Sequence, residues 1–101
     1  MSTLKFIVLK CKDIEESREF YERWVGLKFA KEKHGSEHYA AELEGGIVFE
    51  LYPMEDNHGE GPEPGDEKPT FGFDIKHDIN PEFEDVFMAD PDGNLNMLKR
   101  K

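Results

Sequence analysis

The sequence predicts an α+β fold in which most elements are strands. Apolar residues repeat with the helical period in one segment, 13–27, while the other apolar runs are short and rich in β-branched and aromatic residues. A third observation divides the chain, because residues 53–69 are rich in Pro, Gly and acids and offer almost nothing to bury. We therefore expect a single domain over residues 1–101, with a first βαβββ module (1–52), an acidic linker (53–69) and a shortened second module (70–101).

The helical segment, DIEESREFYERWVGL, contains its own start and stop signals. Asp13 and Glu16 have the spacing of a capping box, which satisfies the first free amides of a helix. Gly26 is suited to end the helix in a left-handed conformation. The apolar stripe, which we expect to lie in the core, consists of Ile14, Phe20, Tyr21, Trp24 and Val25.

Strands are expected on both sides of the linker. In the first module they cover 4–11, 28–33, 37–43 and 46–52. The short turns HGSE and EGG predict that the last three form an antiparallel meander. In the second module strands are expected at 70–76, 82–90 and 94–100, with a loop at 78–82 and no second amphipathic helix.

The acidic stretch MADPDGNLNML (88–98) predicts a turn and not a calcium site. Asp90, Asp92 and Asn94 supply oxygens at alternate positions, as in an EF-hand, but the sixth and twelfth positions lack the required Gly and Glu. Pro91 and Gly93 instead suit a tight turn. We expect this turn to join the last two strands as a hairpin.

The composition limits the possible partners. The formal net charge of −10, from 23 acids against 13 Lys and Arg, disfavours nucleic acid and anionic membrane surfaces. The single cysteine, Cys11, excludes an internal disulfide. No signal peptide is visible, and no apolar run approaches the roughly 20 residues that span a bilayer. We therefore expect a cytoplasmic protein.

The four histidines do not predict a metal site. His34 and His38 are four residues apart, which would match a helical metal-binding pair, but their segment is expected to be turn and strand. His58 lies in the linker and His77 close to the loop at 78–82. Without a cysteine or a second close histidine, a structural zinc site is not expected, and surface or hydrogen-bonded histidines are the simpler interpretation.

Glu50 is the polar residue that most needs a partner. In IVFELY it shares a strand face with Val48 and Tyr52, while Phe49 and Leu51 point to the opposite face. A carboxylate on an otherwise apolar, buried face requires a base, a metal ion or a bound ligand. The alternative is an edge position in which the carboxylate reaches solvent.

Taken in order, these segments resemble the vicinal oxygen chelate superfamily of glyoxalases, bleomycin resistance proteins and extradiol dioxygenases. The resemblance covers most of the chain and rests on KDIEESREFYERWVGLKF, GIVFELYP, FGFDI and ADPDGNLNML. It implies paired βαβββ modules whose sheets curl into a cup around a ligand. In metal-dependent members, four inward side chains, usually His, Gln or Glu, chelate a divalent ion.

The four ligand positions that the resemblance implies fall on Phe6, Glu50, Thr70 and Met97. Of these, only Glu50 suits a hard or borderline divalent ion, since Phe6 has no donor atom and Met97 is a soft, weak one. We therefore expect no metal ion and no cofactor, and Glu50 is the one candidate for a catalytic residue. The expected ligand-binding residues are Phe6, Val8, His38, Glu50, Tyr52, Thr70 and Met97.

The second module departs from the family pattern. Only KHDINPEF separates FGFDI from the next strand, which is too short for the helix that the family places there. One face of the second sheet would then lack a cover. A second copy of the chain is the simplest cover, so we expect a homodimer with swapped or side-by-side modules.

Three functions remain open on the sequence alone. The first is metal-independent binding of a small molecule, as in the bleomycin-resistance type, with Glu50 favouring a cationic or aromatic ligand. The second is a lyase, isomerase or dioxygenase with Glu50 as general base, and with His38 or His77 recruited if a metal takes part. The third is a non-catalytic dimeric scaffold whose cup has collapsed. The sequence names neither a ligand nor a reaction.

Overall fold

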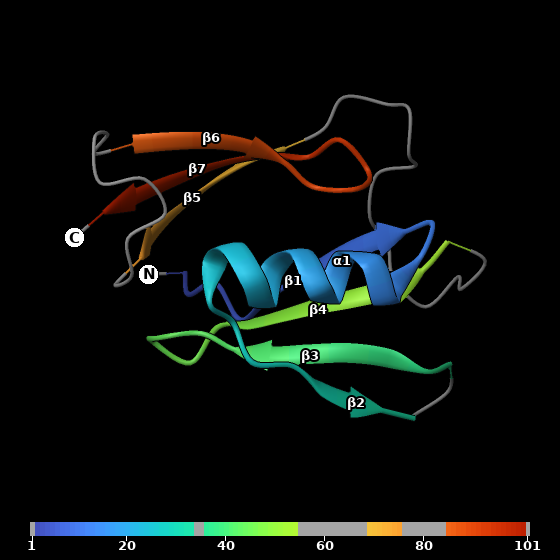
Figure 1. The fold of residues 1–101 in the computed structure, drawn as a ribbon. Helices are drawn as coiled ribbons and strands as arrows, with labels where there is room; N and C mark the ends of the chain where they lie inside the picture. Colours follow the sequence, from blue (N-terminus) through green and yellow to red (C-terminus); the bar gives the residue numbers. More distant parts are fainter. Residues whose placement is uncertain (1, 34–35, 55–68, 76–84, 101) are drawn as a thin grey trace.

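The computed structural model describes residues 2–33, 36–54, 69–75 and 85–100, which form two sheets with one helical segment between them (Figure 1). Sheet A has the strand order β1-β4-β3-β2, and sheet B has the order β5-β7-β6. The elements of the first half are β1 (Phe6–Cys11), α1 (Ile14–Phe20), η1 (Tyr21–Val25), β2 (Ala30–Glu32), β3 (His38–Glu42) and β4 (Val48–Pro53). The elements of the second half are β5 (Thr70–Ile75), β6 (Asp85–Ala89) and β7 (Leu95–Arg100).

The order of elements confirms the predicted βαβββ arrangement. In sheet A, β2, β3 and β4 form the expected antiparallel meander, and β1 pairs in parallel with β4. In sheet B, β5 pairs in parallel with β7, while β6 and β7 form an antiparallel hairpin. The strand expected at 28–33 is shorter than predicted, because only Ala30–Glu32 pairs with β3.

The helical segment begins and ends where the sequence predicts. The Asp13 side chain accepts hydrogen bonds from the backbone N–H groups of Glu15 and Glu16, and Gly26 ends the segment with φ +84°. The second half differs from the expected α-helix, because Tyr21–Val25 forms a π-helical turn in which the Gly26 amide donates to the Tyr21 carbonyl at 3.0 Å. The wider turn keeps Tyr21 buried toward the core.

The core fills the space between sheet A, the helical segment and sheet B. Phe49 and Leu51 of β4 are fully buried on the face that α1 covers, and the Tyr21 ring packs on Phe49 with 5.0 Å between ring centroids. Phe73 of β5 lies against both rings, at 6.4 Å from Tyr21 and 6.1 Å from Phe49. Alternate residues of both sheets therefore point into one shared core. The opposite face of each sheet points away from it.

The turn after β6 confirms the predicted hairpin and also has a second role. Asp90 makes the turn, since its backbone carbonyl accepts from the Gly93 amide at 2.9 Å. Its buried carboxylate accepts from the backbone amides of Asp92 and Asn94 through Oδ1 at 3.0 and 2.8 Å. Its Oδ2 accepts from the side-chain NH2 group of Asn94 at 2.9 Å and from the Tyr21 hydroxyl at 2.7 Å. The acids expected to make only a turn also hold sheet B to the helical segment.

Asp92 adds a second connection between the two halves. Its Oδ1 accepts from the Lys12 backbone amide at 3.0 Å, and its Oδ2 accepts from the Ser17 hydroxyl at 3.3 Å. We call Tyr21, Ser17, Asp90, Asp92 and Asn94 the inter-sheet clamp. Burial, and then the neighbouring Asp90 carboxylate, raise the pKa of the Tyr21 hydroxyl far above its usual value. The tyrosine therefore stays a proton donor to Asp90 at any ordinary pH.

Several sequence predictions lie outside the described residues. They are residues 55–68 of the linker expected at 53–69, the loop at 78–82, and His34, His58 and His77. The linker begins later than predicted, because Pro53 still belongs to β4. Within the described residues of the second half, every regular element is a strand. No helix in the described part of the chain has the length and hydropathy to cross a bilayer.

Candidate functional site

The predicted site residues of the first module lie on the outer face of sheet A, opposite α1. Strand alternation places Glu50 and Tyr52 on this face, because Phe49 and Leu51 between and beside them point into the core. The parallel register pairs Val8 with Glu50. Phe6, two residues before Val8, is on the same face and is 59% exposed.

His38 joins this face through β3. Ala40 pairs with Glu50, so His38, two residues earlier, points to the same side of the sheet. Its Nε2 lies 3.4 Å from Glu50 Oε2 and 3.2 Å from the Tyr52 hydroxyl, and that hydroxyl donates to Glu50 Oε2 at 3.3 Å. The imidazole and the Tyr52 ring are stacked, with centroids 4.1 Å apart and an interplanar angle of 11°. We call His38, Glu50 and Tyr52 the His38 cluster.

The His38 cluster is only partly shielded from solvent. His38 is 2% exposed, and its Nδ1 lies 3.0 Å from the Ser36 carbonyl. The Glu50 side chain is 19% exposed, and its contacts with described residues all use Oε2. The Oε1 oxygen of Glu50 therefore faces no donor from the described part of the chain. The carboxylate thus has partners in its own chain through Oε2 and is also partly open to solvent.

Glu32 belongs beside this cluster, although sequence reasoning did not identify it. Its Oε2 lies 3.5 Å from His38 Nε2, because the β2–β3 register pairs Glu32 directly with His38. The hairpin prediction at HGSE did not give this pair, since counting outward from residues 34–37 places Lys33, and not Glu32, opposite His38. His38 is hydrogen-bonded, as expected, but buried and not at the surface.

The second-module residues predicted for the site lie elsewhere. Thr70 and Met97 are on the outer face of sheet B, since Phe71, Phe73 and Leu98 point into the core. The register places Phe87 opposite Met97 on this same outer face. In one chain the outer faces of the two sheets point away from the shared core and thus from each other. The structure therefore brings together Phe6, Val8, His38, Glu50 and Tyr52, and it separates them from Thr70 and Met97.

The donor set does not fit the divalent ion of the metal-dependent members. Of the four implied positions, two carry Phe6 and Met97, and Thr70 lies on a different face from Glu50. Among the residues that the structure describes, no group of three or more His, Cys, Asp or Glu side chains is arranged to hold a metal ion. The groups that do meet here are the carboxylates of Glu50 and Glu32, an imidazole and a phenol. They can bind a cation, accept and donate hydrogen bonds, and move a proton.

Comparison with known proteins agrees with this fold. A sequence profile of the Glyoxalase/Bleomycin resistance protein/Dioxygenase superfamily matches residues 3–86. No curated protein sequence matches the chain.

Solved structures show the same architecture at low identity. A glyoxalase-related enzyme from Fulvimarina pelagi is similar with a TM-score of 0.68 and 16% identity, over 100% of this chain and 89% of that chain. A protein from the mobile metagenome of V. pseudocholerae gives 0.67 and 22%, over 99% and 95%. An antibiotic binding protein from Streptomyces sp. CB03234 gives 0.64 and 16%, over 99% and 96%. These likenesses confirm the predicted fold class.

Proposed function

Because this chain belongs to the Glyoxalase/Bleomycin resistance protein/Dioxygenase superfamily, we propose that it binds a small organic molecule on the outer face of sheet A without a metal ion. The observation that carries the proposal is the Glu50 carboxylate. Its Oε2 contacts Tyr52 and His38, while its Oε1 has no donor among the described residues. The side chain is 19% exposed and shares its face of the sheet with Phe6 and Val8. A partly desolvated carboxylate beside apolar side chains is suited to a ligand with a positive charge.

The neighbouring side chains favour a ligand with an aromatic or other flat apolar part. The partly exposed Tyr52 ring, stacked on the buried His38, lies next to Glu50, and Phe6 exposes its ring on the same face. The fold is also used by an antibiotic binding protein, whose identity to this chain is 16%. The proposed ligand is therefore a cationic aromatic molecule.

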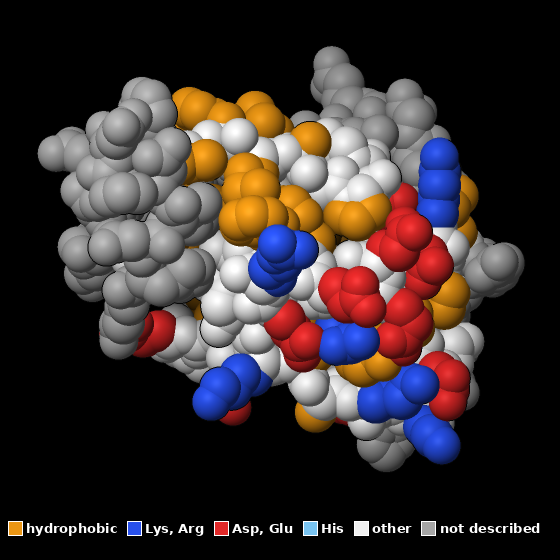
Figure 2. Space-filling view, in the orientation of Figure 1, with side chains coloured by type: hydrophobic (Ala, Val, Ile, Leu, Met, Phe, Trp, Pro, Cys, Tyr) orange, Lys and Arg blue, Asp and Glu red, His pale blue; other side chains and the backbone are white. Residues whose placement is uncertain are grey.

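A second copy of the chain is proposed to complete the site. Phe87, 61% exposed, and Leu95 lie on the outer face of sheet B with Met97, and hydrophobic side chains line the upper part of the molecule over this sheet (Figure 2). Such a face is normally covered by another surface. In a homodimer, sheet B of one copy would set Thr70 and Met97 opposite Glu50 of the other.

Light scattering after size-exclusion chromatography tests the dimer. We expect the wild-type chain to be a dimer at micromolar concentration, and Phe87→Asp to be a monomer because it places a charge in the apolar contact. Glu19→Gln changes the charge of a 73% exposed side chain on α1, outside the outer face of sheet B, and should leave the dimer intact. A monomeric wild-type chain would refute the arrangement.

Thermal-shift screening tests the binding function. The panel should contain cationic drugs, neutral aromatics and thiol conjugates, each with wild type and Glu50→Gln. A ligand at 100 times its dissociation constant stabilises the protein by about 2.7 kcal/mol, which such a screen detects. We expect cationic aromatics to shift the wild-type midpoint, Glu50→Gln to lose that shift, and Glu19→Gln, with its 73% exposed side chain on α1, to keep it. Silence across the panel would instead favour the scaffold function.

Proton-transfer catalysis is a second candidate, because the His38 cluster places three proton-carrying groups in contact. His38 Nε2 lies within 3.4 Å of Glu50 and 3.2 Å of Tyr52, so Glu50 would act as a general base and the imidazole would pass the proton on. The hemithioacetal of methylglyoxal and glutathione is a direct probe of a glyoxalase-type isomerisation. Turnover that Glu50→Gln abolishes would favour the enzyme over the binding protein.

A further inference from the structure

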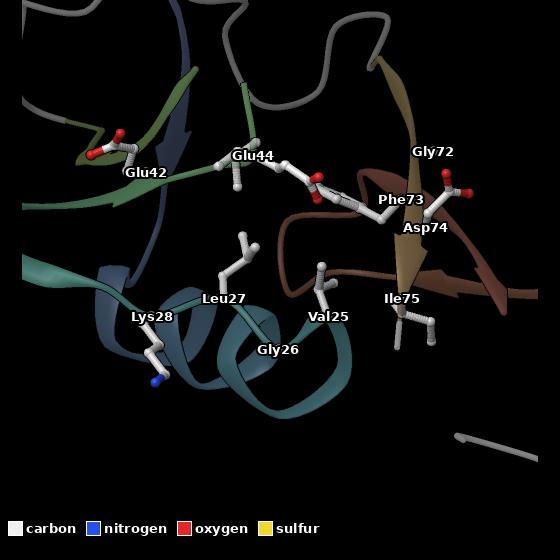
Figure 3. Close-up of a pocket in the computed structure, with 11 residues that line it drawn as sticks. Val25, Gly26, Leu27, Lys28, Glu42, Glu44, Gly72, Phe73, Asp74 and Ile75 are labelled. Atoms are coloured by element: carbon white, nitrogen blue, oxygen red, sulfur yellow. The ribbon is translucent and has the colours of Figure 1, made fainter. Parts of the chain in front are cut away.

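A pocket of about 690 Å³ opens away from the His38 cluster, at the end of sheet A where β3 turns into β4. It lies where the end of the helical segment, the turn between β3 and β4, and strand β5 meet (Figure 3). None of the seven residues predicted for the site lines it. Its volume is within the range of pockets that take drug-sized molecules, roughly 300–1,000 Å³.

The walls of this pocket combine apolar side chains with charged ones. Val25 and Leu27 rise from the end of the helical segment toward the space, and Phe73 of β5 lies across from them (Figure 3). Leu27 and Phe73 pack against the core but remain partly exposed. The pocket therefore offers apolar surface, including one aromatic ring, that is still accessible to a ligand.

The charge of the pocket is negative. Its lining contains three carboxylates, from Glu42, Glu44 and Asp74, and one ammonium group, from Lys28. Figure 3 shows the Glu44 carboxylate directed from the β3–β4 turn toward Phe73, while Glu42 and Lys28 point outward. Within the described residues, Glu44 makes no salt bridge or side-chain hydrogen bond. A carboxylate without a cation, beside an aromatic ring, is complementary to an ammonium group on an apolar body.

We propose that this pocket is a second ligand site, separate from the outer face of sheet A, and that it binds an amine with an aromatic or branched aliphatic body. The ammonium group pairs with Glu44, and the apolar body lies against Leu27 and Phe73. The pocket lies at the end of sheet A where β3 turns into β4, and none of its lining residues belongs to the His38 cluster. The two sites therefore do not share a side chain.

Three probes with the same body and different charge test the proposal. They are 2-phenylethylammonium, 2-phenylethanol and 3-phenylpropionate, titrated into the full chain by NMR with assigned amide signals. We expect the amine to bind about tenfold more tightly than the alcohol, which corresponds to about 1.4 kcal/mol, and the carboxylate to bind weakest. The shifts should centre on Val25–Lys28 and on β5.

Matched variants assign the binding to this pocket. Glu44→Gln should reduce the affinity for the amine to that for the alcohol, while Glu19→Gln, which removes the same charge from a 73% exposed side chain on α1 outside the pocket, should leave it unchanged. Glu50→Gln should leave unchanged the affinity measured from the signals of Val25–Lys28 and β5, because an amine bound beside Glu50 shifts other signals. Loss of amine binding in Glu50→Gln but not in Glu44→Gln would overturn the proposal and place the ligand on the outer face of sheet A. Equal affinity for all three probes would overturn it as well.

Discussion

Two carboxylate–tyrosine pairs in this molecule look alike in chemistry and differ in use. Asp90 accepts from the Tyr21 hydroxyl at 2.7 Å, and Glu50 accepts from the Tyr52 hydroxyl at 3.3 Å. Both oxygens of Asp90 are occupied by donors from its own chain, and the whole pair is buried. Glu50 is partly exposed, and its Oε1 has no donor among the described residues. The contrast indicates what separates a structural carboxylate from a ligand-binding one. In the structural carboxylate, the protein itself donates hydrogen bonds to both oxygens.

The largest expected effect is that of Asp90→Asn. Asparagine replaces one of the two acceptor oxygens with an NH2 group, which is a donor. That NH2 group then faces other donors, either the Tyr21 hydroxyl and the Asn94 side chain or the backbone amides of the turn. Removing a buried charged acceptor from such a network costs about 3 kcal/mol. Urea unfolding followed by circular dichroism measures the free energy of unfolding.

Asp13→Asn is the matched control for that experiment. Asp13 caps α1 from an exposed position, where Asn is as good a capping residue as Asp. Its cost should stay below about 0.5 kcal/mol. Equal losses in the two variants would mean that the inter-sheet clamp does not hold sheet B in place.

Tyr21→Phe should have the next largest effect. The ring remains to pack on Phe49, but Asp90 Oδ2 loses its shortest hydrogen bond and Asn96 loses an acceptor for its amide group. A lost hydrogen bond to a buried charged group costs about 2 kcal/mol. The free energy of unfolding in urea checks this value, and a loss within experimental error would show that water replaces the hydroxyl.

The inter-sheet clamp could not be predicted from the sequence, although the fold could. The strands, the Asp13 cap and the Gly26 stop depend on neighbouring residues, so local patterns were sufficient to predict them. The contact between Tyr21 and Asp90 joins residues 69 apart, and the contact between Ser17 and Asp92 joins residues 75 apart. No local pattern specifies which distant helix an acidic turn will meet.

The candidate site was predictable only where strand alternation applies. Side chains of a strand alternate between the two faces of a sheet, so the sequence predicts that Glu50 and Tyr52 share a face opposite Phe49 and Leu51. The structure places Glu50 and Tyr52 together on the outer face of sheet A. The separation of Thr70 and Met97 from that face depends on how sheet B packs, through Phe71 and Phe73, onto the helix side of sheet A. Side-chain packing of this kind is a tertiary property that the order of elements does not determine. The π-helical turn at Tyr21–Val25 was missed for the same reason.

Alkaline pH should lower the free energy of unfolding through Cys11, which lies beside Ser17 and Asp92 of the clamp. Burial raises the pKa of the Cys11 thiol from 9.0 to about 12. Between pH 9 and pH 10 the unfolded chain releases this proton while the folded chain retains it, so rising pH favours unfolding by up to about 1.4 kcal/mol per pH unit. Tyr21, whose pKa burial also raises, adds to the loss above its usual value of 10.0.

Cys11→Ala isolates the thiol contribution in that window. The variant starts from a lower stability because it removes a buried side chain, but its stability should fall less steeply between pH 9 and pH 10 than that of the wild type. Urea unfolding at several pH values gives both slopes. Parallel slopes would show that the thiol ionises as easily in the folded chain as in the unfolded one.

The smallest expected effect is that of Tyr52→Phe, the counterpart of Tyr21→Phe on the outer face of sheet A. The ring stays stacked on His38, and the partly exposed Glu50 can exchange the lost hydroxyl for water. The cost in unfolding free energy should therefore stay below about 1 kcal/mol, less than that of Tyr21→Phe. If the same two variants were compared for ligand affinity, the order should reverse, since Tyr52 orients Glu50 and Tyr21 lies in the clamp. Equal stability losses in Tyr21→Phe and Tyr52→Phe would mean that the His38 cluster is as structural as the clamp. That result would contradict the proposal that Glu50 binds a ligand.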